Sequence, residues 1–453
     1  MWSILYYLRV DPAKLKNSLR KRGLDPSIVD KAVELDKRWR ETVTELNKLR
    51  AEHNKLSAEI AKLPPEERKK KIEEAKKLLE KIKEVEEQEK RYKQERDNIL
   101  LSLPNTVDED VPEGPDENYN VPVKFFGKPK VYKEYLQQFF EQLKGWQVEY
   151  EVVEQRPRHH YEMEELGYVD TRQAGKVAGS RFYYMLGDIL WLELALVLYA
   201  IDFLKRKGYV PVLPPYMLKR QYYLGAEDLQ AFKDAIYEVV EEELCLIATA
   251  EHPIAAMMAG KVFEEGELPL KIVGFSPCFR KEAGAHGKDT KGIFRVHQFE
   301  KVEQFIFCKP EDSRKFLEEL KDNMCELAEG LGIPYRLVLL CSGDMGRRAV
   351  KQYDLEGWFP GQGRYRELGS CSNCTDWQSY RLDIRYRLPD GSTDYVHTLN
   401  CTAIAVQRTI ACIFENYVQE DGTIEIPRVL RKYLEPAETA PKDYIRPANI
   451  RLP

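Results

Sequence analysis

Residues 278–305 read CFRKEAGAHGKDTKGIFRVHQFEKVEQF, and this stretch joins two β-rich runs through a small basic loop. The first run, KIVGFSPCFRKE, covers residues 271–282, and the second, GIFRVHQFEKVEQFIF, covers residues 292–307. Two such runs separated by a glycine-bearing loop predict a β-hairpin with a long connection.

The second run places an unusual set of side chains on one face. Side chains alternate between the faces of a strand, so this face is predicted to carry Ile293, Arg295, His297, Phe299, Lys301, Glu303 and Phe305. Four of the seven can carry a charge, which is not typical of a core face. Arginine suits phosphate, an aromatic ring suits a base, and a carboxylate suits an ammonium or hydroxyl group. The face therefore favours an adenine nucleotide and an amino acid as ligands; an exposed strand with cross-strand ion pairs is the alternative.

The chain as a whole, at 453 residues, is too long for one average core, so two domains are expected. Its net charge of −5 means that any nucleic-acid surface has to be a local patch. No apolar run approaches the ~20 residues of a membrane span, and Arg9 and Asp11 interrupt the apolar N-terminus before it could serve as a signal-peptide core. Nine cysteines without a repeated pattern indicate reduced thiols. We expect a cytoplasmic protein that does not enter a membrane.

A helical arm is predicted near the N-terminus. Residues 27–103 contain no glycine, and their only prolines are Pro64 and Pro65. On both sides of this pair, mostly apolar residues recur at alternating spacings of three and four, with charged intrusions at Glu89 and Arg96, as in a coiled coil. Proline ends the first helix. The result is an antiparallel helical hairpin roughly 55 Å long.

The arm has two possible roles. A coiled coil can hold two chains together, but an intramolecular hairpin buries its seam without a partner. Its other faces carry basic clusters, Arg68–Lys71 near the tip and Arg20–Arg22 near the base, which could contact phosphates, although interspersed glutamates also fit a solvated helix face.

A mixed region follows the arm. Residues 104–120 are acidic and rich in proline, glycine and asparagine, as in a linker, so we place the arm at 1–107, the linker at 108–120 and a second domain at 121–453. DIRYRLPDGSTDYVHTL, residues 383–399, predicts an antiparallel hairpin. Regular strand–helix alternation and glycine-rich phosphate loops are missing. The predicted fold class is α+β, with an antiparallel sheet and helices packed against it.

Three further signals concern chemistry. Arg408 is the only charged residue between His397 and Glu415 in an apolar stretch, so it must meet an anion, either a protein carboxylate or a triphosphate. Thr249 and Glu251 alternate on a predicted strand end. Cys371 and Cys374 form a C-x-x-C without a second pair at suitable spacing, which favours structural cysteines over a zinc site.

These residues resemble the seryl-tRNA synthetases, a class II aminoacyl-tRNA synthetase family, over essentially the full chain. FRKEAG, the loop and FRVHQFEKVEQ resemble motif 2 in its seryl form, and HTLNCTAIAVQRTIACIFENYVQEDGTIEIPRVLRKYL resembles motif 3 and its continuation. ATAEHPIAAMM, CSGDMG and SCSNCTDWQ are similar to archaeal-type members. GYVPVLPPYM, residues 208–217 with Pro211 and Pro214, is similar to motif 1.

The resemblance implies an enzyme that activates L-serine with ATP and transfers the seryl group to the 3′ end of tRNA(Ser), with Arg280 and Arg408 as catalytic residues. It implies that ATP contacts Arg280, Glu282, Arg295, Val296, Phe299, Glu367, Ser370 and Arg408. Glu367 and Ser370 would hold Mg²⁺ through ATP. Serine would be surrounded by Thr249, Glu251, Arg280, Glu303, Asn400 and Thr402.

The resemblance also implies a coiled-coil arm that binds tRNA(Ser) across a homodimer, the motif 1 region at the dimer interface, and a catalytic sheet of about six antiparallel strands. Three positions depart from the family pattern and leave the shape of the serine pocket open: Cys401, Gly369 and Gln407. One rival is a relative that activates an amino acid for a carrier protein, which would lack the long arm. The other is a paralogue that only binds RNA, which should have lost the phosphate arginines.

Overall fold

The computed structural model describes residues 2–228, 233, 235–282, 289 and 291–448. The chain divides into a helical unit, residues 1–106, and a larger unit, residues 107–453. Each unit has a hydrophobic cluster of its own. Within the described residues, no helix is both long and apolar enough to cross a membrane.

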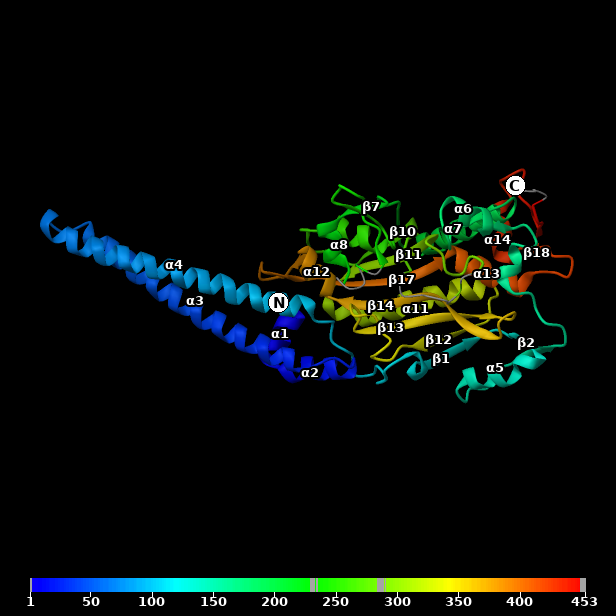
Figure 1. Cartoon of the computed structure of the whole chain (residues 1–453), viewed down its shortest axis with the longest axis horizontal. Coiled ribbons are helices and arrows are strands. Elements are labelled where there is room, and N and C mark those ends of the chain that lie inside the picture. Colours follow the sequence, from blue (N-terminus) through cyan, green and yellow to red (C-terminus); the bar gives the residue numbers. More distant parts are fainter. Residues whose placement is uncertain (1, 229–232, 234, 283–288, 290, 449–453) are drawn as a thin grey trace. The chain divides into compact units, whose positions relative to one another are not determined.

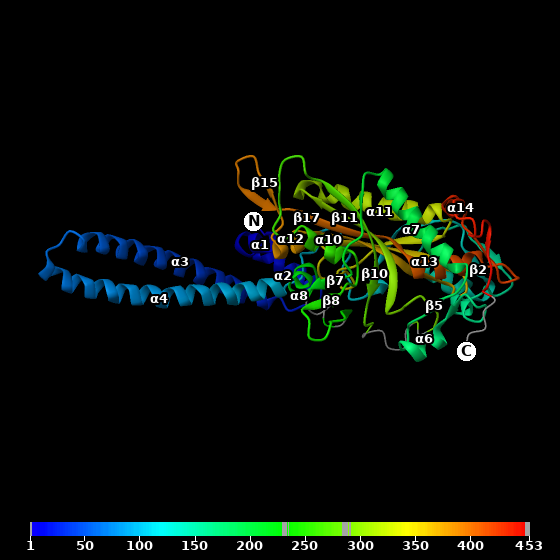
Figure 2. The ribbon, with the colours of Figure 1, turned by 90° about the horizontal axis from the view of Figure 1, so that it is seen from above.

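The helical unit consists of α1 (Ser3–Val10), α2 (Pro12–Lys21), α3 (Ser27–Ile60) and α4 (Pro65–Ser102). The long helices α3 and α4 run antiparallel, side by side (Figure 2). Pro65 begins α4, a position where proline is tolerated because the first helical N–H groups have no acceptor within the helix. The predicted hairpin is thus confirmed, and its buried seam is formed by Leu46, Leu49, Ile82 and Val85.

The two charged intrusions in the predicted seam have partners on α3. The Trp39 indole Nε1 donates a hydrogen bond to Glu89 at 2.6 Å. Arg96 is 4% exposed; it lies 2.8 Å from the Asp36 carboxylate, with its guanidinium 4.5 Å from the Trp39 ring centroid. A buried cation needs such pairing to be tolerated, and here the pairing joins the two helices.

An eight-stranded sheet forms the centre of the larger unit (Figure 1). Its strands, in spatial order, are β1 (Val121–Phe126), β12 (Tyr335–Leu339), β13 (Lys351–Phe359), β14 (Arg364–Thr375), β17 (His397–Ala405), β11 (Gln298–Cys308), β10 (Leu270–Phe279) and β6 (Val210–Val212). All neighbouring pairs are antiparallel except β6 and β10, which are parallel. The α+β class is confirmed, with two strands more than the resemblance implied.

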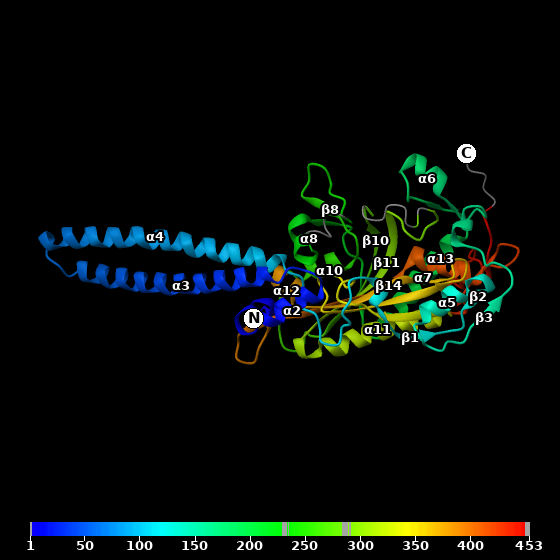
Figure 3. The same cartoon turned by 60° about the horizontal axis from the view of Figure 1, so that its bottom comes forward.

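The two faces of this sheet pack against different sets of helices. One face packs against α7 (Ile189–Arg206), α11 (Ser313–Gly330) and the apolar side of α13 (Val406–Tyr417) in the main core. The other face is partly covered by α8 (Arg220–Ala226), α10 (Glu251–Met257) and α12 (Trp377–Leu382), so that α11 and α8 lie on opposite sides of the sheet (Figure 3). Alternation along β11 sends Val302 and Ile306 to the first face and Glu303 and Phe305 to the second.

Smaller elements surround this sheet. β15 (Arg385–Arg387) and β16 (Thr393–Tyr395) form the predicted hairpin of residues 383–399, and β9 (Val262–Phe263) pairs with β15. The other short strands pair as β2 (Lys130–Tyr132) with β3 (Glu151–Val153), β4 (Val169–Asp170) with β5 (Tyr184–Met185), β7 (Met217–Lys219) with β8 (Leu244–Leu246), and β18 (Ile424–Glu425) with β19 (Tyr444–Ile445). Three more α-helices are α5 (Leu136–Leu143), α6 (Thr171–Val177) and α14 (Arg428–Leu434).

The hairpin of residues 271–307 is present as β10 and β11, but its second strand is shorter than predicted. β11 begins only at Gln298. Before it the chain bends, and the consecutive residues Ile293 and Phe294 both pack into the main core cluster, whereas consecutive residues of a strand point to opposite faces. The predicted common face of residues 293–305 is therefore wrong for its first half. Loop residues 283–288 and 290 lie outside the described residues.

Candidate active site

A pocket of about 370 Å³ lies against β11, β14 and β17, and α10 and α13 contribute to its walls. Its lining includes every residue that the sequence analysis assigned to a substrate: Thr249, Glu251, Arg280, Glu282, Arg295, Val296, Phe299, Glu303, Glu367, Ser370, Asn400, Thr402 and Arg408. These residues come from distant parts of the chain, and the sheet brings them together because β11 pairs with β17 and β17 pairs with β14.

Arg408 lies in the first turn of α13. Its Nη1 is 3.0 Å from Glu367 Oε2, and its Nε donates a hydrogen bond to the Phe294 carbonyl at 3.3 Å. The charge of Arg408 is the main reason that the pKa of Glu367 is lowered. Of the two expected anions, the structure therefore contains the protein carboxylate, at the wall of the pocket.

Arg280 follows the last residue of β10 and also reaches the pocket. Its Nε donates to the Ala248 carbonyl at 3.3 Å, and its guanidinium carbon lies 5.1 Å from the Phe299 ring centroid. A carbonyl and an aromatic ring hold the guanidinium without neutralising it. Arg280 is therefore suited to bind an anion in the pocket.

Arg295 precedes β11 and is ion-paired with Glu282, whose Oε2 lies 2.7 Å from Arg295 Nη1. Two members of the predicted face do not line the pocket. His297 contacts the Phe182 ring, and Phe305 is buried in the apolar cluster beside α10. The grouping of Arg295 with Phe299 thus results from the bend before β11 and not from strand alternation.

Oxygen atoms gather on β13 and β14. Asp354 of β13 is in register with Ser370 of β14, and Gln352 donates to the Ser370 hydroxyl at 2.7 Å. Burial, together with the nearby charge of Glu367, raises the pKa of Asp354 well above its usual value. Sequence reasoning assigned Glu367 and Ser370 but missed Asp354, because only the pairing of β13 with β14 brings it near them.

A second group of lining residues is formed by Thr249, Glu251, Glu303, Asn400 and Thr402. All five are buried. Glu303 and Thr402 are direct partners across β11 and β17. Glu251 is the first residue of α10, and its backbone N–H donates to the Thr249 hydroxyl at 3.2 Å. The predicted strand end at these two residues is thus wrong, because Thr249 lies in the turn that starts a helix.

Two cations beside these residues, Arg348 and Lys301, were not assigned to a substrate from the sequence. Arg348 forms ion pairs with Glu251 and, at 3.0 Å, with Glu227. Lys301 Nζ lies 2.5 Å from Glu303 Oε2. The signal for Lys301 was its spacing of two from Glu303 on one strand. Arg348 is the second residue after the CSGDMG stretch, but its carboxylate partners are more than 90 residues away in the chain.

The three departures from the family pattern have clear positions. The Cys401 thiol points to the side of α11, 3.5 Å from the Leu320 carbonyl, and so away from Asn400 and Thr402. A Cβ at Gly369 would lie 3.1 Å from Met324 Sδ and from Thr402 Cβ, so little room exists there for a side chain. Gln407 accepts a hydrogen bond from the Glu300 backbone N–H at 2.8 Å, which joins α13 to β11.

Cys371 and Cys374 lie on opposite faces of β14, as residues three apart on a strand must. Cys371 is buried in the main core, and Cys374 lines the pocket, 3.4 Å from the Asn400 amide nitrogen. The preference for structural cysteines over a zinc site agrees with this arrangement. Within the described residues, the group whose potential metal-ligand atoms converge is instead His159, His160 and Glu415.

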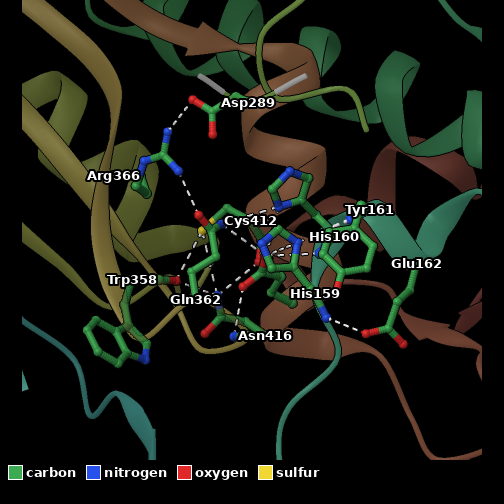
Figure 4. A network of polar contacts seen from close by, with 12 residues as sticks. His159, His160, Tyr161, Glu162, Asp289, Trp358, Gln362, Arg366, Cys412 and Asn416 are labelled. Carbon is green, nitrogen blue, oxygen red and sulfur yellow. Dashed lines mark hydrogen bonds and ion pairs between the residues drawn. The ribbon is translucent and has the colours of Figure 1, made fainter. Parts of the chain in front are cut away.

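That group is the buried end of a hydrogen-bond network (Figure 4). Glu415 accepts hydrogen bonds from the backbone N–H groups of His160 and Gly361, at 2.9 and 2.8 Å, and from the Gln362 amide at 3.1 Å. Burial is the main cause that lowers the pKa of His159 to about 4. Because the oxygens of Glu415 already accept these hydrogen bonds, the group is a structural anchor and not a metal site.

The network continues toward the pocket through Arg366. Its Nη1 donates to Gln362 and its Nη2 to Asp289, both at 2.6 Å. The guanidinium also lies 4.2 Å from the Phe294 ring centroid, and Asp289 is 3.9 Å from Arg295 Nε. Arg366 thus connects a buried carboxylate to the segment that carries Arg295.

Two family models match the chain. Residues 5–107 match the seryl-tRNA synthetase N-terminal domain, and residues 235–417 match the tRNA synthetase class II core domain (G, H, P, S and T). Among curated proteins, the serine–tRNA ligase of Korarchaeum cryptofilum is 54% identical over 98% of each chain. That of Archaeoglobus fulgidus is 54% identical over 99% of this chain and 100% of its own.

Solved structures agree. The seryl-tRNA synthetase from Pyrococcus horikoshii complexed with ATP matches with a TM-score of 0.93 and 46% identity, over 98% of this chain and 99% of that chain. The cytoplasmic serine–tRNA ligase from Naegleria fowleri in complex with AMP matches with a TM-score of 0.83 and 38% identity, over 97% and 96% of the two chains.

Proposed function

This chain belongs to the seryl-tRNA synthetases, class II aminoacyl-tRNA synthetases, and we infer that it activates L-serine with ATP and transfers the seryl group to the 3′ end of tRNA(Ser). The observation that carries this inference is that the lining of one pocket combines three arginines, an aromatic ring and buried carboxylates. Cations for phosphate, a ring for the base and carboxylates for the amino acid meet within 370 Å³.

The first step joins serine to AMP. A serine carboxylate oxygen attacks the α-phosphorus of ATP in line, the new O–P bond forms, and the bond to the departing pyrophosphate breaks. In the second step the terminal ribose hydroxyl of the tRNA attacks the acyl carbon, loses its proton, and AMP leaves. Neither step needs a nucleophilic side chain, so the protein contributes orientation and cationic stabilisation of the phosphates.

For ATP, we assign the α-phosphate and the carboxylate end of serine to Arg280, and other phosphate oxygens to Arg295 and Arg408. Phe299 would stack on the adenine, while Glu282 and the backbone of Val296 would read its edge. The position of Arg295 and Arg408 on the pocket wall, where ion pairs with Glu282 and Glu367 hold both side chains, supports this assignment.

For Mg²⁺, we assign Glu367 and Ser370 as ligands through the ATP phosphates. The donor set fits the ion, because Mg²⁺ prefers oxygen ligands and Asp354 adds a further carboxyl next to Glu367. When bound, the ion would neutralise phosphate charge and help to orient the triphosphate.

For serine, we assign Thr249, Glu251, Glu303, Asn400 and Thr402 in addition to Arg280. Glu303 is buried, and Lys301 Nζ lies 2.5 Å from its Oε2. A carboxylate has more lone pairs than this one ion pair uses, so Glu303 can also accept a hydrogen bond from a substrate. The serine hydroxyl or ammonium group supplies such a donor.

For tRNA(Ser), we assign the arm formed by α3 and α4. At its tip Lys69 and Lys70 are exposed, whereas Lys71 is paired with Glu59 at 2.6 Å. Exposed lysines along a hairpin support phosphate contacts, which would make binding steeply salt-dependent and sensitive to RNA shape. The arm also disfavours a relative that charges a carrier protein, and the three pocket arginines disfavour a paralogue that only binds RNA.

We also propose a homodimer in the cytoplasm, with the tRNA bound across it. On α7 the side chains of Leu190, Leu194 and Leu198, spaced four apart, are 43–49% exposed. At the sheet edge, Val210 of β6 and the following Leu213 are 52% and 68% exposed. A continuous apolar helix stripe beside an open strand edge supports burial against a second copy in the motif 1 region.

The test is serine-dependent exchange of pyrophosphate into ATP. Serine should support exchange, and alanine should support it about 10⁴–10⁵-fold less in kcat/KM, because a site built to hydrogen-bond a hydroxyl leaves its polar groups unpaired with the analogue. Threonine should also be rejected. Equal exchange with alanine would remove the claim of serine specificity, and no exchange with any amino acid would remove the claim of activation.

A further inference from the structure

Lys301 and Glu303 form a buried ion pair inside the pocket. They are two residues apart on β11, so both side chains point to the same face. Lys301 is 6% exposed and Glu303 is 1% exposed, and Nζ lies 2.5 Å from Oε2. A pair this far from solvent is costly to assemble, so its presence at a substrate site calls for a functional reason.

Lys301 is the cation closest to Glu303. The charged groups that face Glu303 are Lys301 on its own strand, Arg280 at the end of β10 and Glu251 on α10. Thr402, its partner on β17, is neutral, and Gly274, its partner on β10, has no side chain. Arg280 is held by the Ala248 carbonyl and the Phe299 ring.

Glu251 adds negative charge beside Glu303 but has cationic and amide partners of its own. Arg348, Gln378 and Asn400 contact its carboxylate. Burial is the main cause of the raised pKa of Glu303; Glu251 adds to the rise, while Lys301 opposes it more than Arg280 does. Without Lys301, this carboxyl would have lost its principal cation in a buried site, and protonation would be favoured.

We propose that Lys301 is a positioning residue that holds the Glu303 carboxylate charged and oriented toward the amino acid substrate. The inference rests on the proposed function, because it is the ammonium and hydroxyl groups of serine that need a charged acceptor at Glu303. In this proposal Lys301 affects serine binding through Glu303, whereas ATP binding depends on the arginines.

The experiment compares K301M, which removes the charge at similar length, with K301R, which keeps it. Serine and ATP KM values are measured by pyrophosphate exchange as a function of pH. In K301M the serine KM should rise by about tenfold or more at about pH 6 and recover as the pH increases, since a KM that follows the ionised fraction of Glu303 changes about tenfold per pH unit below its pKa. The ATP KM should change little, and K301R should retain a profile near that of the parent.

Lys271→Met is the matched control. Lys271 lies on the adjacent strand β10 and pairs with Glu319 at 2.8 Å, but it does not line the pocket. Its loss should leave the pH profile unchanged. Should K301M fold poorly, an unpaired buried carboxylate is the expected cause, so K301M/E303Q should fold again; failure of this double variant would overturn the pairing.

Three other outcomes would also overturn the proposal: an unchanged serine pH profile in folded K301M, the same defect in K301R, or a defect confined to the ATP KM. An absence of serine-dependent exchange in the parent protein is a different result, because it would contradict the proposed function itself.

Discussion

Replacing Arg280 with alanine should reduce amino-acid activation while leaving the fold intact. The side chain contacts the Ala248 carbonyl at 3.3 Å and the Phe299 ring at 5.1 Å, and it lines the pocket where the α-phosphate is assigned. Its main contribution should therefore appear when charge develops on the reacting phosphate and not in the resting protein.

The two expected magnitudes can be separated. Loss of one group that stabilises transition-state charge costs about 10²–10³ in kcat, or about 2.7–4 kcal/mol. The stability cost is smaller, because one hydrogen bond to a carbonyl and one cation–π contact together contribute about 1–2 kcal/mol. Catalysis should thus fall by far more than a loss of folded protein could explain.

The assay is serine-dependent pyrophosphate exchange, with thermal unfolding measured on the same samples. Arg387→Ala is a suitable control, because Arg387 lies on β15, pairs with Glu264 at 2.9 Å and is not part of the pocket lining. A folded R280A protein that exchanges at nearly the parental rate would refute the assignment of Arg280. A large loss in R387A as well would show that the defect is not specific to the pocket.

Two further experiments test the arm and the network behind Arg295. Removing residues 45–84 and joining the shortened helices with a glycine-containing turn keeps the Trp39–Glu89 contact. Pyrophosphate exchange should stay near the parental rate, and charging of tRNA(Ser) should be abolished. Normal charging would instead show that the arm is only a spacer. Arg366→Ala should raise the ATP KM about tenfold by loosening the Arg295 segment, with little change in the serine KM. Arg364→Ala, two positions earlier and exposed, should resemble the parent, and equal effects of the two substitutions would contradict the positioning argument.

The local sequence pattern was sufficient to predict secondary structure wherever the spacing of apolar residues repeats along the chain. The hairpin of α3 and α4 follows from the 3-4 spacing and from Pro64 and Pro65, because helix periodicity and proline act on neighbouring residues. The antiparallel pair β10 and β11 follows from two β-rich runs around a loop. The resemblance to the synthetase family then indicated which polar residues to expect near a nucleotide.

Partners that are distant in the chain could not be predicted in this way. Asp36 with Arg96 and Arg348 with Glu251 are separated by 60 and 97 residues, and only the packed structure brings them together. The direction of Cys401 likewise depends on which face of β17 meets α11.

The most instructive difference concerns the segment before β11. Strand alternation predicted one continuous face from Ile293 to Phe305, but the chain bends where Ile293 and Phe294 both pack into the main core cluster, and β11 starts at Gln298. Residue spacing therefore identified Lys301 and Glu303 as neighbours, whereas the position of Arg295 was set by its contacts with Glu282 and Asp289. Residue periodicity predicts side-chain directions only where the backbone is regular, and packing in the core determines where a regular strand begins and ends.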